Sequence, residues 1–417
     1  MKKYRVLFVT PLPPPVHGSS IVSEFIKNSK LIKDEMDCQY VNLSTSRSVG
    51  EIGKFHIAKL FRFVMSYLVV LLKLLTQRYD LVYLAITVGG VGFLKDCPFV
   101  LMAKLFCEKV VVHHHNKGMS KYVDKMPYKV LYRLVYNKVK VILLSWNLFD
   151  DISTIVNKDD VMICPNGLPP IAGNVSKKED KKVPNILFLS NLIESKGVFV
   201  LLDACRIMMR ENLKFSVTFV GGESKMINRD VLEKAMKDRG LTSGCGVEME
   251  YVGSKYGKDK ECYWNNADIF VLPTCYECFP LVVIEAMQHK LPVVSTDEGG
   301  IVDIVDNWNE EKQCGTGFLV HSQVLRENCC NESLGELTSE KEFEKTCAFN
   351  EIRGKETAEA LSRLVKDEQL RKEMGRAGYQ KYLDQLTLEK FEYNMLCCLK
   401  SALGHRRKKI EKISNKY

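Results

Sequence analysis

The repeated alternation of short apolar runs with longer helical patterns is the feature that most constrains how this chain folds. In the first half, each apolar and β-branched run is followed by a segment whose apolar residues recur at helical spacing. Continuous apolar strands separated by helices are typical of a parallel sheet covered on both faces. The pattern therefore predicts a doubly wound α/β domain, with strands at 4–10, 80–86, 109–113 and 140–145 and helices at 19–30, 94–107, 128–137 and 146–156.

The same alternation starts again after a break in the middle of the chain. Two Pro clusters, Gly, Ser and a charged run mark residues 169–184 as a linker. A length of 417 residues also favours two domains. Doubly wound sheets bind ligands outside the carboxyl ends of their strands, so we expect the function in a cleft between the two domains. The second set of strands is expected at 186–191, 215–222, 247–253, 269–274 and 292–300.

These boundaries predict an N-terminal domain over residues 1–168 and a C-terminal domain over 185–385. Within the second domain the chain is polar and irregular from His321 to Gly354, which predicts an insertion or long surface loop before helices resume at Glu356. Residues 386–417 form a C-terminal helix and a basic tail, for which a return to the N-terminal domain stays open.

The basic excess of the chain lies in its N-terminal part. Residues 1–170 carry 23 Lys and Arg against 13 Asp and Glu, the remaining residues carry 37 against 38, and the formal net charge is +9. This asymmetry favours an anionic partner such as a lipid surface or a phosphate-bearing substrate. The N-terminus lacks the apolar stretch of a signal peptide, and the 15 cysteines show no repeated spacing. We therefore expect a cytoplasmic protein with reduced thiols.

The longest apolar region, residues 57–75, is interrupted by basic residues and is too short between them to span a bilayer. At 100° per residue, Lys59, Arg62, Ser66 and Lys73 share one face with Gln77, which predicts a basic amphipathic helix. Two interpretations stay open. The helix lies on an anionic membrane at the inner face of the cell membrane, or it is a surface helix with its apolar side on the core.

Three consecutive histidines, His113, His114 and His115, stand where an apolar strand ends. A metal site is one interpretation, but no acidic or cysteine partner follows at a ligand spacing. A purely structural role is the second. The third is contact with a substrate, in which a neutral or cationic imidazole binds a sugar hydroxyl or steadies a developing charge.

Two strand-to-helix loops carry features suited to phosphate. Gly18 opens a helix after the first strand, and Lys196 with Gly197 opens another after the first strand of the second domain. A helix N-terminus offers unpaired N–H groups, and an ammonium group beside it suits a diphosphate. An ordinary turn and a solvated lysine are the alternatives. The chain holds no G-x-G-x-x-G, which counts against a dinucleotide dehydrogenase.

The stretch "CYECFPLVVIEA" contains two candidate pairs. Cys275 and Cys278 have a C-x-x-C spacing, but further zinc ligands are missing at a workable spacing, so we interpret them as packing residues. Glu277 falls in a loop, whereas Glu285 falls inside a helix for which Pro280 is the expected first residue. The two carboxylates can therefore reach different parts of one elongated polar ligand.

Around these residues the sequence resembles the retaining, nucleotide-sugar-dependent glycosyltransferases of the group-one type (family four), which have the GT-B fold and include many bacterial polysaccharide enzymes. The resemblance covers nearly the whole chain. It rests on the E-x7-E stretch "TCYECFPLVVIEAM" together with seven further pieces in order, "PPPVHGSS", "HHHNKG", "CPNGLP", "FLSNLIESKG", "PVVSTDEGGIVDIV", "GTGFLV" and "EMGRAGYQKY". It implies two facing Rossmann-like domains, with the nucleotide sugar bound mainly by the C-terminal one.

The resemblance also implies roles for individual donor-binding residues. Lys196 would contact the diphosphate, Glu277 the hydroxyls of the donor sugar, and Glu285 the nucleotide ribose. The backbone around Phe279, Pro280 and Leu281 would contact the phosphate and the sugar.

For the remaining positions, Gly18 would approach the phosphate, and His113 or His115 would lie near the anomeric centre. His113, His115 and Glu277 are thus the candidate catalytic residues. Members of this family often have arginine where this chain has Asn191. Neutralisation of the diphosphate would then depend more on Lys196, or the donor would be held differently.

The sequence therefore predicts a glycosyltransferase that moves a sugar with retention from a nucleotide sugar to a glycan or lipid-linked acceptor, in the synthesis of a cell-surface polysaccharide such as lipopolysaccharide or capsule. No metal or other cofactor and no nucleic-acid partner are expected, and peripheral membrane contact through the basic N-terminal domain is one expectation. The alternatives are a sugar-nucleotide epimerase or a phosphorylase of the same architecture, and a non-catalytic protein that binds nucleotide sugars or anionic glycans.

Overall fold

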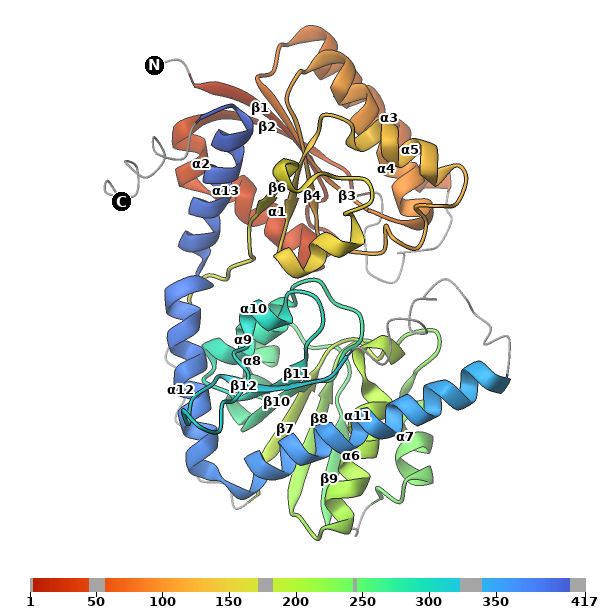
Figure 1. Cartoon of the computed structure of the whole chain (residues 1–417), viewed down its shortest axis with the longest axis vertical. Coiled ribbons are helices and arrows are strands. Elements are labelled where there is room, and N and C mark those ends of the chain that lie inside the picture. Colours follow the sequence, from red (N-terminus) through yellow and green to blue (C-terminus); the bar gives the residue numbers. More distant parts are fainter. Residues whose placement is uncertain (1–2, 45–56, 172–182, 243–245, 323–339, 406–417) are drawn as a thin grey trace. The chain divides into compact units, whose positions relative to one another are not determined.

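The computed structural model describes residues 3–44, 57–171, 183–242, 246–322 and 340–405 (Figure 1). The chain divides into two compact units. Unit 1 consists of Met1–Gly167 and Leu388–Tyr417, and unit 2 consists of Leu168–Thr387. The predicted linker at 169–184 falls largely outside the described residues.

Unit 1 is built on a six-stranded, all-parallel sheet in the order β2-β1-β3-β4-β5-β6. The central strands are buried along their whole length, as their apolar composition predicts. The register places His113 beside Ala85 and His114 beside Ile86, at the carboxyl end of the sheet. The strands are β1 (Tyr4–Thr10), β2 (Met36–Asn42), β3 (Leu81–Ile86), β4 (Val110–His114), β5 (Lys140–Leu143) and β6 (Val161–Ile163).

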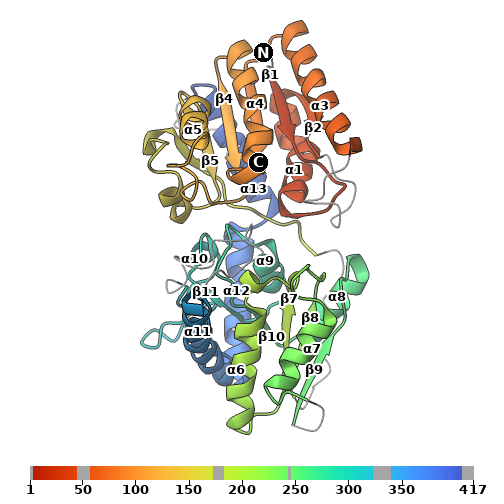
Figure 2. The ribbon, with the colours of Figure 1, turned by 90° about the vertical axis from the view of Figure 1, so that its right-hand side faces the viewer.

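Helices cover both faces of this sheet (Figures 1 and 2). One layer consists of α3 (Ile57–Thr76), α4 (Gly90–Phe106) and α5 (Tyr128–Tyr136), which pack in that order. The other consists of α1 (Gly18–Asn28), α2 (Lys30–Glu35) and α13 (Leu388–Ala402). The helix expected at 146–156 is instead a short 3₁₀ helix, η2 (Trp146–Asp151), and η3 (Lys158–Asp160) precedes β6.

Helix α13 belongs to unit 1 although unit 2 precedes it in the chain. Its Lys400 donates a hydrogen bond to Glu35 at 2.7 Å, and the carbonyl of Leu403 accepts one from Lys109 at 2.8 Å. The basic tail after His405 lies outside the described residues.

The orientation of α3 corrects one interpretation of the sequence. Its polar side faces the protein, because Ser66 donates a hydrogen bond to the carbonyl of Asn42 and Lys73 donates one to Gln39. Large apolar side chains such as Phe61 and Leu72 are exposed on the opposite side. The interpretation of α3 as a surface helix with its apolar side on the core is therefore correct only in part, because Val70 and Leu74 are buried but most of the large apolar side chains are exposed.

Unit 2 is also built on a six-stranded, all-parallel sheet, in the order β12-β11-β10-β7-β8-β9. This order is that of a dinucleotide-binding Rossmann sheet, with β7 and β10 adjacent at the centre. The strands are β7 (Asn185–Leu189), β8 (Phe215–Val220), β9 (Val247–Tyr251), β10 (Ile269–Leu272), β11 (Val293–Thr296) and β12 (Gly317–Val320).

The connections of unit 2 are helical, as a parallel sheet requires. Its helices are the 3₁₀ helix η4 (Glu194–Lys196), α6 (Val198–Arg210), α7 (Arg229–Asp238), α8 (Gly257–Asn266), α9 (Leu281–Gln288), α10 (Ile301–Ile304), α11 (Glu340–Lys366) and α12 (Glu368–Gln385).

Helix α11 begins at Glu340, so the expectation that residues 321–354 are irregular is wrong for the part after 339. Its second half packs on α6 and buries Arg353, whose guanidinium donates to the carbonyl of Pro273. Residues 323–339 lie outside the described residues. Both units are thus doubly wound Rossmann-like sheets, the architecture of the GT-B class.

Candidate functional site

The strand order of unit 2 reverses between β7 and β10. From β7 the sheet continues through β8 and β9, whereas from β10 it continues through β11 and β12 in the other direction. The loops that follow β7 and β10 therefore diverge, and doubly wound sheets bind ligands at this point. The predicted residues Asn191 and Lys196 lie on the first loop, and Glu277, Phe279 and Pro280 lie on the second.

Lys196 and Glu277 form an ion pair across these two loops. The Nζ atom of Lys196 lies 2.6 Å from Oε1 of Glu277, and it also lies 3.5 Å from the carbonyl oxygen of Tyr276. Both side chains are about four-fifths buried, with exposed fractions of 20% and 19%. Partial burial strengthens this interaction relative to a surface pair, and an anionic ligand at this place would compete with Glu277 for the ammonium group.

The backbones of the two loops are fixed to each other beside this pair. The carbonyl of Ser195 accepts hydrogen bonds from the Cys275 amide at 2.8 Å and the Thr274 hydroxyl at 2.9 Å. Gly197 has φ +83°, and a Cβ atom there would lie 2.1 Å from the carbonyl oxygen of Pro273. Only glycine permits this approach, so it holds Lys196 opposite the loop that carries Glu277.

The loop after β11 supports Glu277 from a third direction. Gly299 has φ +54°, and a Cβ atom there would lie 2.3 Å from the carbonyl oxygen of Glu277. The amide of Gly300 donates a hydrogen bond of 2.6 Å to the carbonyl of Cys278. The stretch "DEGG" therefore provides the close backbone contact between this loop and the loop that carries Glu277.

Helix α9 begins at Leu281, and Pro280 is its N-cap residue with φ −71° and ψ 119°. The expectation that Pro280 is the first helical residue is wrong by one position, because its ψ is extended. Phe279 is buried, and Leu281 is half-buried at the start of the helix. The first amides of α9 have no partner within the helix, as at every helix start.

Glu285 lies within α9, and its carboxylate is held by Lys260 of α8. The Nζ atom of Lys260 lies 2.7 Å from Oε1 and 2.6 Å from Oε2 of Glu285. His289 connects the same helices, because it lies 2.8 Å from the carbonyl of Glu285 and 2.9 Å from Glu261. Sequence reasoning missed Lys260, since it falls in a polar helix with no motif around it.

Asn191 is engaged within unit 2. Its Oδ1 accepts a hydrogen bond of 3.1 Å from the amide of Gly222, which ties the loop after β7 to the loop after β8. An arginine at this position would not accept that bond, because a guanidinium group has donors only. Asn191 therefore makes a hydrogen bond that the arginine common at this position in the family could not make.

Cys275 and Cys278 are buried. Among the residues that the structure describes, no group of three or more His, Cys, Asp and Glu is placed to hold a metal ion. The burial of Cys275 and Cys278 agrees with their interpretation as packing residues.

The histidines of unit 1 lie at the carboxyl end of its sheet. His113 is fully buried, and its Nδ1 lies 2.6 Å from the Tyr83 hydroxyl. The ring of His115 lies 4.1 Å from that of His113. The Nε2 atoms of both rings are buried and make no hydrogen bond within the described part of the chain. His114 points to another partner, because its Nε2 lies 2.8 Å from the Tyr136 hydroxyl.

Burial lowers the pKa of all three imidazoles. The pKa of His113 falls well below its usual value through burial, with the neighbouring histidines adding to the shift. Burial lowers the pKa of His114 to about 4, and burial with the neighbouring His114 and His17 lowers the pKa of His115 to about 3. At neutral pH these rings are uncharged, so they can donate or accept hydrogen bonds but do not supply positive charge.

Gly18 is the first residue of α1. The preceding His17 caps the helix, with its Nδ1 accepting from the Ser20 amide at 3.3 Å and the Ser20 hydroxyl accepting from the His17 amide at 3.0 Å. No atom lies within 4 Å of a Cβ built on Gly18, so the space before it is open. Because α1 follows β1 and the histidines end β4, both lie at the carboxyl edge of the unit 1 sheet.

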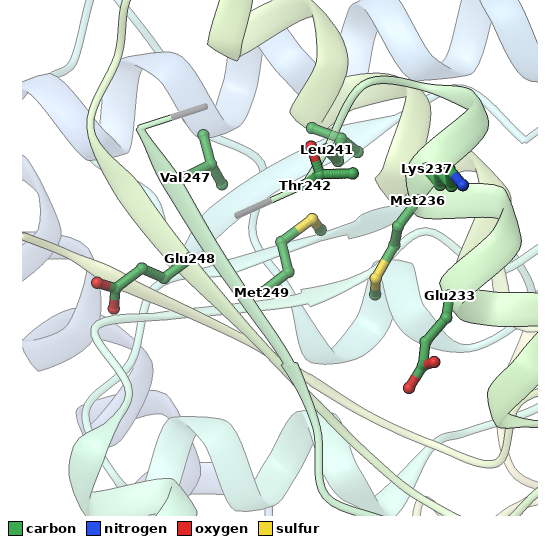
Figure 3. Close-up of a pocket in the computed structure, with 8 residues that line it drawn as sticks. All are labelled: Glu233, Met236, Lys237, Leu241, Thr242, Val247, Glu248 and Met249. Atoms are coloured by element: carbon green, nitrogen blue, oxygen red, sulfur yellow. The ribbon is translucent and has the colours of Figure 1, made fainter. Parts of the chain in front are cut away.

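A cavity of about 500 Å³ lies elsewhere in unit 2 (Figure 3). It is formed by the end of α7, by Leu241 and Thr242, and by the start of β9, at the amino edge of the sheet rather than its carboxyl edge. None of the predicted site residues contributes to it. Its lining residues are Glu233, Met236, Lys237, Leu241, Thr242, Val247, Glu248 and Met249.

The second half of the sequence is similar to known glycosyltransferases. The family model for group 1 glycosyl transferases matches residues 174–353. An uncharacterised glycosyltransferase of Methanocaldococcus jannaschii is 28% identical over 189 residues, which are 42% of this chain and 46% of that protein. The amylovoran biosynthesis glycosyltransferase AmsK of Erwinia amylovora is 31% identical over 149 residues, which are 34% of this chain and 35% of that protein. Each match thus spans less than half the length of the relative.

The fold matches over almost the entire chain. The crystal structure of Anabaena Alr3699/HepE in complex with UDP-glucose has a TM-score of 0.62 to this structure at 15% identity, covering 95% of this chain and all of that one. At this identity the similarity establishes the fold alone. The match to the group 1 glycosyl transferase family model, over residues 174–353, falls within unit 2.

Proposed function

We propose that the protein is a retaining glycosyltransferase that moves a hexose from a nucleotide sugar to a glycan or lipid-linked acceptor in the synthesis of a cell-surface polysaccharide. The observation that carries the proposal is the ion pair of Lys196 and Glu277 between the loops after β7 and β10. Its chemistry fits both ends of a sugar diphosphate, since an ammonium group binds phosphate and a carboxylate accepts hydrogen bonds from sugar hydroxyls.

Binding of the donor would exchange the partners of this pair. The diphosphate takes the ammonium group of Lys196, and the released carboxylate of Glu277 turns to the hydroxyls of the sugar. The amides at the start of α9, from Leu281 onward, add donors toward the phosphate. Support for a nucleotide-sugar donor also comes from HepE, which was crystallised with UDP-glucose.

Glu285 would bind the nucleotide ribose through its hydroxyls. Lys260 fixes the direction of the Glu285 carboxylate from α8, so Lys260 acts as a positioning residue. The ribose hydroxyls then meet a carboxylate whose rotamer is already set, which reduces the entropy cost of binding.

In the transfer step the acceptor oxygen forms a bond to the anomeric carbon while the bond from that carbon to the diphosphate oxygen breaks. The hydroxyl proton passes to the departing diphosphate on the same face of the sugar, and the configuration is retained. Lys196 stabilises the charge that develops on the diphosphate, a role that other enzymes give to a divalent metal ion. Neutral His113 or His115 would bind a substrate hydroxyl through the buried Nε2.

The direct experiment measures release of nucleotide from a panel of UDP-, GDP- and ADP-sugars, with thermal shift as a measure of binding. We expect one nucleotide class to stabilise the protein and to be turned over with acceptor. Binding without turnover, after glycan and lipid-linked acceptors have been screened, would favour a non-catalytic binding protein instead.

The structure offers a matched control for the site. Arg239 and Asp203 form an ion pair in the same unit at 2.7 Å, with exposed fractions of 21% and 16%, but they lie at the C-cap of α7 and within α6 rather than on the two loops. We expect Glu277→Gln to lower kcat/KM by about 100-fold or more, and Asp203→Asn to change it less than about threefold. Equal effects of the two substitutions would contradict the assignment of the site.

A further inference from the structure

Helix α3 of unit 1 exposes a continuous row of large apolar side chains, which we name the α3 outer face. Its members have exposed fractions between 37% and 66%. They recur at intervals of three and four residues, so they lie on one side of the helix. The α3 outer face consists of Leu60, Phe61, Val64, Met65, Leu68, Val69, Leu72 and Leu75.

The opposite side of α3 is fixed against the rest of unit 1. Phe63 and Tyr67 both pack edge-on against Phe99 of α4 at 5.6 Å. Val70 and Leu74 are buried, and Lys73 donates its hydrogen bond to Gln39. Rotating the helix to bury its outer face would break these contacts and expose the buried residues, so the exposure is a built-in feature of unit 1.

The width of the α3 outer face indicates what kind of surface covers it. At 100° per residue its members spread over about 180° of the helix circumference, and at 1.5 Å per residue they extend over roughly 22 Å. A coiled-coil partner would need only a narrow seam, whereas a bilayer surface contacts a broad face. Among the described residues no helix is long and apolar enough to cross a membrane. The helix is therefore suited to lying in the surface.

The charges around α3 identify the surface further. No acidic residue occurs between Glu51 and Asp80. Lys59, Arg62 and Lys73 belong to the polar side of α3, so the positive charge beside the α3 outer face comes from the neighbouring helices. Helices α4 and α5 continue the same layer (Figure 2). They add exposed apolar residues at Leu105, Phe106, Val130 and Leu134 and exposed basic residues at Lys129 and Arg133.

We propose that the α3 outer face docks on the surface of an anionic phospholipid bilayer, with its apolar side chains in the headgroup region and the exposed Lys129 and Arg133 of α5 near the lipid phosphates. Apolar burial and attraction to anionic lipid act together in such helices. The inference rests on the proposed function in one respect, because a lipid-linked acceptor would be presented at that surface.

The test uses the full-length protein and vesicles of phosphatidylcholine alone or of equal parts phosphatidylcholine and phosphatidylglycerol, with binding measured by flotation. We compare the variant Phe61→Gln/Leu68→Gln/Leu72→Gln with the control Met226→Gln/Val231→Gln/Leu383→Gln, which replaces exposed apolar residues of unit 2. We expect the wild type to bind the anionic vesicles, the α3 variant to lose at least tenfold in partitioning, and the control to lose less than twofold.

Several results would overturn the proposal. The α3 variant binding as tightly as the wild type is one, and absence of binding by the wild type is another. If the wild type is a dimer that the α3 variant converts to a monomer while neither binds vesicles, the face is an interface between two copies.

Thermal shift with the nucleotide-sugar panel separates this proposal from the proposed function. The α3 variant should keep its response to the donor while losing vesicle binding, and circular dichroism confirms that it is folded. Conversely, Glu277→Gln should lose the response to the donor and keep vesicle binding.

Discussion

Replacing Gly197 with alanine provides a quantitative test of how the site is held together. The residue has φ +83°, and a Cβ atom would lie 2.1 Å from the carbonyl oxygen of Pro273. Ordinary contact between such atoms needs about 3.5 Å, so the loops after β7 and β10 must separate by roughly 1 Å. Glu277 follows four positions after Pro273, so the displacement reaches the site.

The expected loss of stability in Gly197→Ala has two parts. The left-handed backbone conformation costs a non-glycine residue about 1–2 kcal/mol. The forced separation of two packed loops adds about 1–3 kcal/mol, by analogy with overpacked cores. We therefore expect Gly197→Ala to lower the free energy of unfolding of unit 2 by about 2–5 kcal/mol.

Gly240→Ala is the matched control for the first part. Gly240 has φ +73° at the end of α7, and nothing lies within 4 Å of a Cβ built there. It should therefore show only the conformational cost, about 1–2 kcal/mol. The difference between the two variants isolates the contact with Pro273.

Urea unfolding followed by tryptophan fluorescence measures these values, because Trp264 and Trp308 are both buried in unit 2. Calorimetric titration with the donor nucleotide sugar measures the effect on the site, where a displacement of this size costs up to about 100-fold. Equal destabilisation by Gly197→Ala and Gly240→Ala, or full donor affinity in Gly197→Ala, would refute the proposed coupling of the loops.

Three further outcomes are expected. Because burial lowers the pKa of His114 to about 4, protons bind preferentially to the unfolded chain between about pH 6.5 and 4. Acidification through this window should therefore destabilise unit 1 by up to about 3 kcal/mol. The melting temperature should depend less on pH in His114→Gln than in the wild type, and an unchanged pH dependence would contradict this. Lys260→Met should raise KM for the donor several-fold with little change in kcat, because it releases the carboxylate of Glu285 without touching the transferred sugar; a loss confined to kcat would argue against a positioning role. Turnover should persist after treatment with EDTA, and restoration of lost activity by added Mg²⁺ or Mn²⁺ would refute the metal-independent mechanism.

Much of the architecture could be predicted because buried parallel strands have a strong sequence pattern. Strand β3 is apolar at every position, and β4 is apolar up to the predicted residue His113. Strand β2 was missed because it lies at the sheet edge, where residues such as Asp37 are exposed and the apolar run is broken. The sequence pattern was weakest where the sheet is least buried.

The orientation of helices and the pairing of side chains were harder to predict than the positions of the elements along the sequence. The polar stripe of α3 was recognised from its spacing, but whether Lys73 faces solvent or Gln39 depends on a polar patch supplied by β2, which is distant in sequence. In the site, Glu277 and Lys196 were both identified, yet their mutual ion pair and the clamp of Lys260 on Glu285 depend on how separate loops and helices pack. The neutral state of His113 and His115 likewise follows from burial, which the sequence alone does not quantify.

The placement of α13 has a consequence for synthesis and folding. Unit 2 is one uninterrupted segment, Leu168–Thr387, whereas unit 1 needs a piece that the ribosome makes after unit 2. Unit 2 can therefore complete its fold on the emerging polypeptide while unit 1 still waits for the partner of Glu35 and Lys109. A chain truncated before Leu388 should therefore still fold unit 2, whereas its unit 1 should be prone to aggregation.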